Sequence, residues 1–347
     1  MGLGIISSLG TDISSVWERL DASPKAAPPG ETAEIPFTLD LPHSQLRRVN
    51  RYSKLAAAGA IQAQKDAFIT IDSGDPFRHG AIFTTGYGSM VSNISFGESV
   101  AGDEPDLCSP TLFAGTVPNS CVGQVCIQLN LKGPSTILVG GNVFLYSKLL
   151  INSGKADVIF AGAVEEYSFD LFSSLGKNEA ARGVKINEAT VVFVLGRARE
   201  NAYCAVGDSA AAGLAAYPLV KKISVQESVT VIRSALRKCL KKTNSPEVII
   251  SSSNGAYFDE AEDAAFKEEA PGASVITGVK PLFGETLGSA FSLNVAVAAM
   301  CLKNGRIPNS LGATRAGVKR ILATGYDTIG NYHCIMLSKG GENLGDA

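Results

Sequence analysis

The sequence predicts an α/β fold made of two halves that repeat one order of elements, and three observations support this. The chain has 347 residues, 45% of them apolar, which is enough to bury one large core or two medium ones. Near-continuous apolar strand patterns alternate with helical patterns, as in a mostly parallel sheet covered on both faces. The second part of the chain repeats this alternation, so we place the two halves at residues 1–200 and 201–347.

In the first half, glycine, proline and polar residues divide the chain into short elements. Helical spacing of apolar residues predicts helices at 14–20, 52–68, 119–130 and 143–153. Apolar and β-branched runs predict strands at 80–86, 135–139, 156–164 and 189–198. Gly86 and Gly88 follow the first of these strands and indicate a tight turn into further helix.

The second half repeats the pattern. We expect helices at 226–242, 259–269 and 286–303. We expect strands at 247–253, 274–278, 320–325 and 332–338. The helix at 286–303 consists almost entirely of small or apolar residues, so it should lie buried between two layers.

Charge and composition exclude several classes of function. Lys and Arg (31) nearly balance Asp and Glu (33), so no overall field attracts nucleic acid or an anionic membrane. No apolar run reaches the roughly 20 residues of a membrane span, and the start lacks the basic residues of a signal peptide. The seven cysteines and three histidines show no metal-ligand spacing. We therefore expect a cytoplasmic protein without a metal or cofactor.

Five segments, in the correct order over almost the whole chain, resemble the β-ketoacyl synthase family. They are GLGIISSLGTDISSVWERL (2–20), RYSKLAAAGAIQAQKDA (51–67), VPNSCVGQVCIQLNLKGPS (117–135), SGKADVIFAGAVEE (153–166) and LGSAFSLNVAVAAMCLKNGRIPNSL (287–311). The resemblance implies the thiolase fold of that family, which has five αβαβα layers and two pseudo-repeated halves.

The family's chemistry needs a cysteine nucleophile at a strand-to-helix turn, where the helix N-terminus lowers the pKa of the thiol. Counting from GPS (133–135) places Asn142 at that position, and no cysteine occurs between residues 127 and 203. An amide cannot accept an acyl group. The helix that follows is about five residues shorter than in the family, which leaves the register beyond Asn142 open.

Two histidines complete the family's site, where they polarise the malonyl thioester and stabilise the enolate. In SSSNGAYFDEAED (251–263) the first histidine position holds Asn254. In VKPLFGETLGSA (279–290) the second holds Glu285, whereas Lys280 of the same motif is kept. By this comparison the chain has no catalytic residue, and the family's glycine-rich terminal motif is degraded to ATGYDTIGNY (323–332).

Within the family this pattern resembles the chain-length factor, the inactive subunit of a type II polyketide synthase. The resemblance implies a heterodimer with an active ketosynthase, an acyl carrier protein as a further partner, and a polyketide chain in a tunnel across the interface. Aromatic (anthraquinone-type) and aryl polyene pathways both remain open. Candidate residues of the tunnel or interface are Leu112, Phe113, Thr116, Val117, Ser120, Asn142 and Phe144. Structural roles are expected for Lys280, Glu165 and Glu188.

Two other functions fit the sequence. A divergent acyltransferase or hydrolase could use Cys121 or a serine of 251–253 as its nucleophile. Alternatively, the chain could act alone, as a homodimeric scaffold or lipid-binding protein with a ketosynthase fold. Thiol labelling that tracks an activity would favour the first, and good behaviour without a ketosynthase would favour the second.

Overall fold

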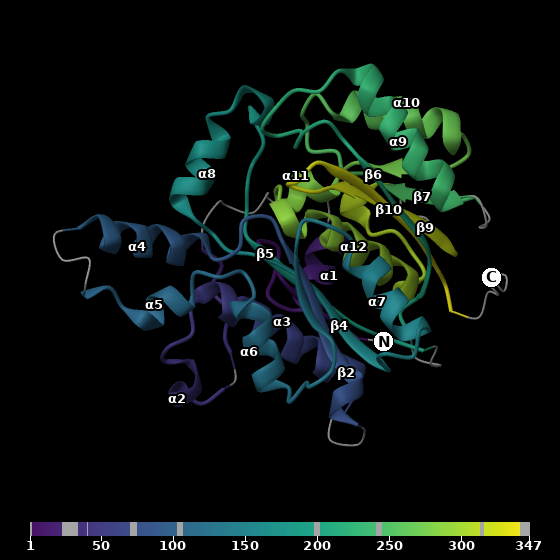
Figure 1. The fold of residues 1–347 in the computed structure, drawn as a ribbon. Coiled ribbons are helices and arrows are strands. Elements are labelled where there is room, and N and C mark those ends of the chain that lie inside the picture. Colours follow the sequence, from purple (N-terminus) through teal and green to yellow (C-terminus); the bar gives the residue numbers. More distant parts are fainter. Residues whose placement is uncertain are drawn as a thin grey trace.

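The computed structural model describes residues 2–22, 34–39, 41–69, 75–102, 107–197, 202–240, 245–312 and 316–340. Two five-stranded sheets form its centre, and helices cover them (Figure 1). No described helix has both the length and the apolar character that a membrane crossing requires.

The first sheet has the strand order β1-β5-β4-β2-β3. Its strands are β1 (Leu3–Ile6), β2 (His79–Thr85), β3 (Ser135–Val139), β4 (Val158–Glu165) and β5 (Ala189–Gly196). The helices of this half are α1 (Ile13–Asp21), α2 (His43–Leu46), α3 (Arg51–Ala67), α4 (Met90–Ala101), α5 (Pro110–Ala114), α6 (Ser120–Gln128), α7 (Val143–Asn152) and α8 (Phe169–Gly176), with 3-10 turns η2 (Pro76–Arg78) and η4 (Glu179–Ala181).

The second sheet has the order β6-β10-β9-β7-β8, which repeats the order of the first strand by strand. Its strands are β6 (Ala205–Gly213), β7 (Val248–Ile250), β8 (Ser274–Ile276), β9 (Arg320–Tyr326) and β10 (Asn331–Ser338). The helices are α9 (Val225–Leu240), α10 (Asp259–Glu269), α11 (Val279–Phe283) and α12 (Ala290–Asn304), with 3-10 turns η5 (Leu287–Ser289) and η6 (Asn309–Leu311). The two pseudo-repeated halves are therefore confirmed at the level of topology.

The expectation of a mostly parallel sheet is wrong, because both sheets are mixed. In the first, β2 runs parallel to β3 and β4, while β5 runs antiparallel to β1 and β4. The second repeats this, with β7 parallel to β8 and β9 and with β10 antiparallel to β6 and β9. A short turn joins β9 to β10, and such a hairpin can only place its strands antiparallel. The apolar patterning does not distinguish the two directions because these strands are buried on both faces.

Five layers result from the packing of helices on the two sheets. Helices α3 and α6 contact the first sheet on its outer face, and α9 with α10 covers the outer face of the second. Between the sheets lie α7, which contacts β4, β2 and β6, and α12, which contacts β9, β10 and β5 (Figure 1). The helix predicted to be buried therefore lies in the central layer.

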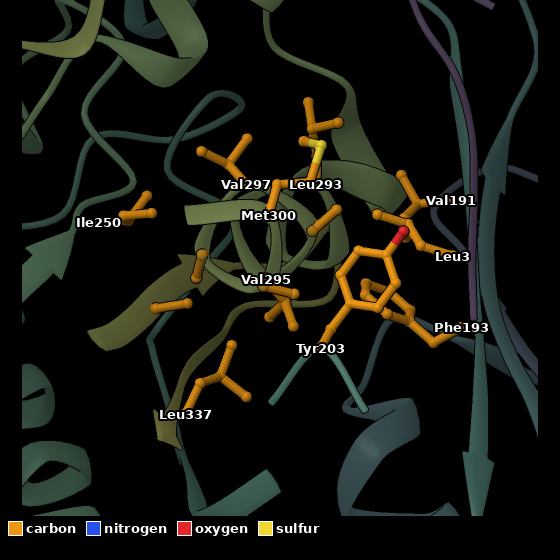
Figure 2. Packing of buried hydrophobic residues seen from close by; sticks show 14 of the residues in the cluster. Leu3, Val191, Phe193, Tyr203, Ile250, Leu293, Val295, Val297, Met300 and Leu337 are labelled. Atoms are coloured by element: carbon orange, nitrogen blue, oxygen red, sulfur yellow. The ribbon is translucent and has the colours of Figure 1, made fainter. Parts of the chain in front are cut away.

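Side chains from both sheets surround α12. Figure 2 shows Leu293, Val295 and Met300 of this helix among side chains of the first sheet, such as Val191, and of the second, such as Ile250. All are fully or almost fully buried. One apolar core therefore ties the two halves together.

The sequence-based elements agree with the structure except at a few places. Strand β6 was not predicted, because its sequence AVGDSAAAG has a single β-branched residue, Val206, and is otherwise small or polar; its conformation depends on pairing with β10. The strand predicted at 247–253 ends at Ile250, since the serines that follow bond to one another instead of extending the ladder.

Candidate functional site

Asn142 begins helix α7 as its N-cap. Strand β3 ends at Val139, and Gly140 and Gly141 turn the chain with φ of 68° and 95°, a region that favours glycine. The Asn142 Oδ1 then accepts hydrogen bonds from the backbone N–H groups of Phe144 and Leu145, both at 3.1 Å. Its Nδ2 donates to Ser209 Oγ at 2.7 Å. Both ends of the amide are occupied, so Asn142 serves a structural purpose here.

Asp327 holds the turn that precedes Asn142. Its Oδ2 accepts from the Gly141 N–H at 2.8 Å and lies 2.8 Å from His333 Nε2. Burial acts to raise the pKa of Asp327, but the hydrogen bond and charge of His333 outweigh it and hold that pKa below its ordinary value. No local pattern predicts this pair, because Asp327 and His333 come from a turn and a strand far from residue 142 in the chain.

Asn254 lies beyond the end of strand β7 and contacts Glu285. Its Nδ2 donates to Glu285 Oε2 at 3.2 Å and lies 2.7 Å from the Tyr326 hydroxyl oxygen. Its Oδ1 accepts from the Ala256 N–H at 3.1 Å. The fold thus brings Asn254 and Glu285 together, and Tyr326 joins them.

Lys280 and Glu285 form a buried ion pair. The Lys280 Nζ lies 2.6 Å from Glu285 Oε2, and both side chains are 1% exposed. Glu285 Oε1 accepts from the Leu287 N–H at 3.1 Å, and Lys280 Nζ lies 4.1 Å from the centre of the Tyr326 ring. The buried partner of Lys280 is therefore Glu285.

Glu165 ends strand β4 and binds backbone groups of both halves. It accepts hydrogen bonds from the N–H groups of Gly86 at 2.7 Å, Tyr87 at 3.0 Å and Gly288 at 3.0 Å. Burial raises the pKa of Glu165 to about 7, although these hydrogen bonds act to lower it. Glu165 thus joins the turn after β2 to the turn before α12.

Two further acidic side chains lie next to Glu165 in the sequence or the sheet. Glu188 forms an ion pair with Arg51 and accepts from the Tyr167 N–H at 2.7 Å. Glu166, which was not singled out from the sequence, accepts from the Val91 N–H at 3.0 Å, and burial raises its pKa to about 7. These carboxylates contact backbone N–H groups and Arg51 of the same chain.

The residues proposed as alternative nucleophiles have no activating environment. Cys121 is buried, and burial raises the pKa of its thiol to about 12, so almost none is thiolate at neutral pH. Ser251 donates its hydroxyl hydrogen to Ser253 at 2.8 Å rather than to a base. Among the residues that the structure describes, no group of His, Cys, Asp and Glu could hold a metal ion.

The tunnel candidates fall into two groups. Asn142 and Phe144 are buried, and the Phe144 ring packs against Phe193 and Phe291 with centroids 4.9 and 6.1 Å away. The others lie on α5, in the turn that follows it and at the start of α6, and the Phe113 ring packs against Phe96 with centroids 5.2 Å apart. The remaining members of this second group are Leu112, Thr116, Val117 and Ser120.

Ser120 also lines a cavity of about 390 Å³ between the start of α3, α5 and α6. None of the other six candidates lines it. Sequence reasoning missed the cavity because three separate helices form it and no motif marks their contact.

An expected loss of stability follows from the cap at Asn142. Asn142→Ala should lower the free energy of unfolding by about 2 kcal/mol, since it removes both a helix cap and a bond to Ser209. Pulse proteolysis of dilute protein in urea would measure this. As a control, Asp12→Ala removes only the cap of α1, where Asp12 Oδ1 accepts from the Ser15 N–H, and should cost about 1 kcal/mol. Equal losses would show that the bond to Ser209 contributes nothing.

Comparison with known proteins agrees with this architecture. No family model matches the chain. It is 24% identical over 352 residues to nodulation protein E of Rhizobium leguminosarum bv. trifolii, covering 88% of this chain and 86% of the relative. It is 25% identical over 361 residues to the tetracenomycin polyketide synthase ketoacyl synthase alpha subunit of Streptomyces glaucescens, covering 88% of this chain and 85% of that subunit.

Solved structures give the same fold. The ishigamide ketosynthase/chain length factor superposes with a TM-score of 0.80 at 18% identity, covering 98% of both chains. The ketosynthase complex AntDE:AntF, a type II polyketide synthase with its acyl-carrier protein, gives 0.77 at 15% identity, covering 97% of both chains. The chain therefore has the thiolase-like fold of the ketosynthases. Its sequence is ketosynthase-like as well, and its relatives include a subunit of a polyketide synthase.

Proposed function

We propose that this chain is a non-catalytic chain-length factor that pairs with an active ketosynthase and shapes the polyketide tunnel. The observation that carries the proposal is the state of the three former catalytic positions. Asn142 caps a helix, Asn254 bonds to Glu285, and Glu285 neutralises Lys280. Neither amide can attack a thioester or accept a proton near neutral pH, and the Glu285 carboxylate is buried in an ion pair with Lys280.

A partner surface supports the pairing. Strand β3 is an edge of the first sheet, so its outer backbone groups face away from the sheet. Large apolar side chains are exposed on β3, on the neighbouring helix α6, and on α5 and α7, which suits a large apolar interface with a second ketosynthase-like chain. These side chains are Phe113 and Val117 near α5, Ile127 on α6, Val139 on β3, and Leu145 and Leu149 on α7.

The first test is chemical. We expect the purified chain alone neither to become acylated by a malonyl-loaded acyl carrier protein nor to release carbon dioxide from it, because a nucleophile and a base are missing. Intact-mass measurement of the chain and detection of labelled carbon dioxide would check this. Acylation or decarboxylation by the chain without any companion would refute the proposal.

The second test is association. Made alone, the chain should aggregate through its apolar edge, and co-expression with an active ketosynthase should yield a stable one-to-one complex that condenses malonyl units. Size-exclusion chromatography with mass analysis of the carrier-bound products would show both. A soluble homodimer that does not bind the ketosynthase would instead support the scaffold function.

Phe113→Ala should lengthen the product if Phe113 obstructs the tunnel, and an unchanged product would remove Phe113 from the tunnel assignment.

A further inference from the structure

Helix α9 and strand β10 each carry a cysteine in the interface between them. Helix α9 packs on β6 and β10 at the outer face of the second sheet (Figure 1). Cys239 lies in the last turn of α9, and Cys334 lies in β10, where it pairs with Ala210 of β6. Both side chains are fully buried, and both thiols are free. The fold therefore brings together two thiols that are far apart in the sequence.

The two sulfur atoms are in contact. The Cys334 thiol is hydrogen-bonded to the Cys239 sulfur, and this bond, together with burial, raises the pKa of Cys334. Cys334 Sγ also lies 3.4 Å from the carbonyl oxygen of Ala235, which comes one helical turn before Cys239. The Cys239 thiol donates to the Asp208 carbonyl at 3.1 Å, and Cys334 Sγ lies 3.8 Å from the Ala210 carbonyl on the same strand. Two thiols held against each other in this way are the arrangement from which a disulfide forms.

The end of α9 is the part of this interface that opens most readily. The last carbonyl groups of a helix have no partner within it, so its final turn frays before its middle does. Cys239 comes directly before Leu240, at which α9 ends. The raised pKa of Cys334 keeps its proton in place near neutral pH, so Cys334 is suited to react second. An oxidant that enters at the open turn would therefore meet Cys239 first.

We propose that Cys239 and Cys334 form a reversible disulfide when the protein is exposed to hydrogen peroxide, and that this bond clamps α9 to β10. In the first step the Cys239 sulfur attacks a peroxide oxygen and the O–O bond breaks, which gives a sulfenic acid and one water molecule that takes up the thiol proton. In the second step the Cys334 sulfur attacks the Cys239 sulfur and displaces its hydroxyl group, which leaves as water with the Cys334 proton. Two thiols are thereby oxidised, and one peroxide is reduced to two water molecules.

The disulfide acts as a redox-dependent lock on the second half of the chain. It closes residues 239–334 into a loop that contains α10, α11, α12, β7, β8 and β9. Joining residues so far apart in the sequence lowers the entropy of the unfolded chain and so stabilises the folded state. This lock goes beyond the pairing with a ketosynthase and does not depend on it.

Peptide mapping of the oxidised protein tests the proposal directly. The dilute full chain is treated with hydrogen peroxide under native conditions, its remaining thiols are alkylated, and it is digested without reductant. We expect a disulfide-linked pair of peptides that contain Cys239 and Cys334, and dithiothreitol should separate the pair. Absence of that pair, or sulfinic acid at either cysteine in its place, would overturn the proposal.

Stability measurements show whether the bond acts as a lock. Peroxide should raise the urea midpoint in pulse proteolysis by about 0.5 M or more, and dithiothreitol should reverse the shift. Cys239→Ala and Cys334→Ala should each abolish the shift, whereas Cys301→Ala, at an equally buried cysteine of α12, should retain it. An unchanged midpoint in the oxidised wild type would refute the lock, and a shift that persists in Cys334→Ala would overturn the assignment to this pair. If the alanine variants fail to fold, the peptide map of the wild type decides alone.

Discussion

Glu285→Gln is expected to lower the free energy of unfolding by about 3 kcal/mol or more. The substitution keeps the size of the side chain but removes the charge that faces Lys280, and both residues are almost fully buried. A lysine ammonium left there without its counter-charge must lose its proton or rearrange the core. The same carboxylate also accepts the bond from Asn254, which the amide would satisfy less well. Pulse proteolysis in urea would measure the loss.

Two controls separate the charge from other effects. Glu179→Gln breaks an ion pair with Lys222 in which both side chains are exposed, so it should leave the stability almost unchanged. The double variant Lys280→Met with Glu285→Leu removes both charges and should recover most of the loss. If Glu285→Gln proved as mild as Glu179→Gln, the buried pair would not be a major source of stability.

The stability of the protein is expected to fall as the pH rises from about 5 to 7. Burial raises the pKa of Glu165 and of Glu166 to about 7, above the ordinary value of 4.5. The folded state therefore holds protons that the unfolded state releases. For each carboxyl group this stabilisation is complete below the ordinary pKa of 4.5 and is lost as the pH rises through about 7. For Glu165 alone, the difference between the folded and unfolded pKa corresponds to about 3 kcal/mol of stability.

Glu165→Gln mimics the protonated acid and should flatten this part of the stability profile by about 3 kcal/mol. Urea denaturation by pulse proteolysis at pH 5, 6, 7 and 8 would give the profile, with Glu179→Gln as a control whose slope over this interval matches that of the wild type. A wild-type stability that rises between pH 5 and 7 would contradict the sign of the effect. A Glu165→Gln profile parallel to the wild type would assign the effect to other groups.

The sequence predicts the elements well where local pattern and tertiary packing agree. The helix at 259–269 and the strand at 135–139 match the structure at both ends, since apolar spacing and turn residues mark them. The prediction of β6 failed because its alanine and glycine residues adopt the strand conformation only through pairing with β10. The prediction of strand direction failed because the sequence of a strand buried on both faces has the same apolar pattern in either orientation.

The candidate site was predicted in part. Counting from motifs identifies Asn142, Asn254 and Glu285, and the structure brings Asn254 and Glu285 into contact. The bonds that close the centre come from Tyr326 and Ser209, which no local motif marks because they reach the site through long-range packing. The cavity beside Ser120 escaped prediction for the same reason.

The exposed edge at β3 has a consequence for how the chain is made in the cell. An unpaired edge with apolar neighbours such as Val139 and Leu149 can stack on identical chains as soon as it emerges. Surplus copies would then be lost to proteolysis or inclusion bodies. Under the proposed pairing with a ketosynthase, matched translation rates of the two chains would prevent that, so their dosage should matter as much as their affinity.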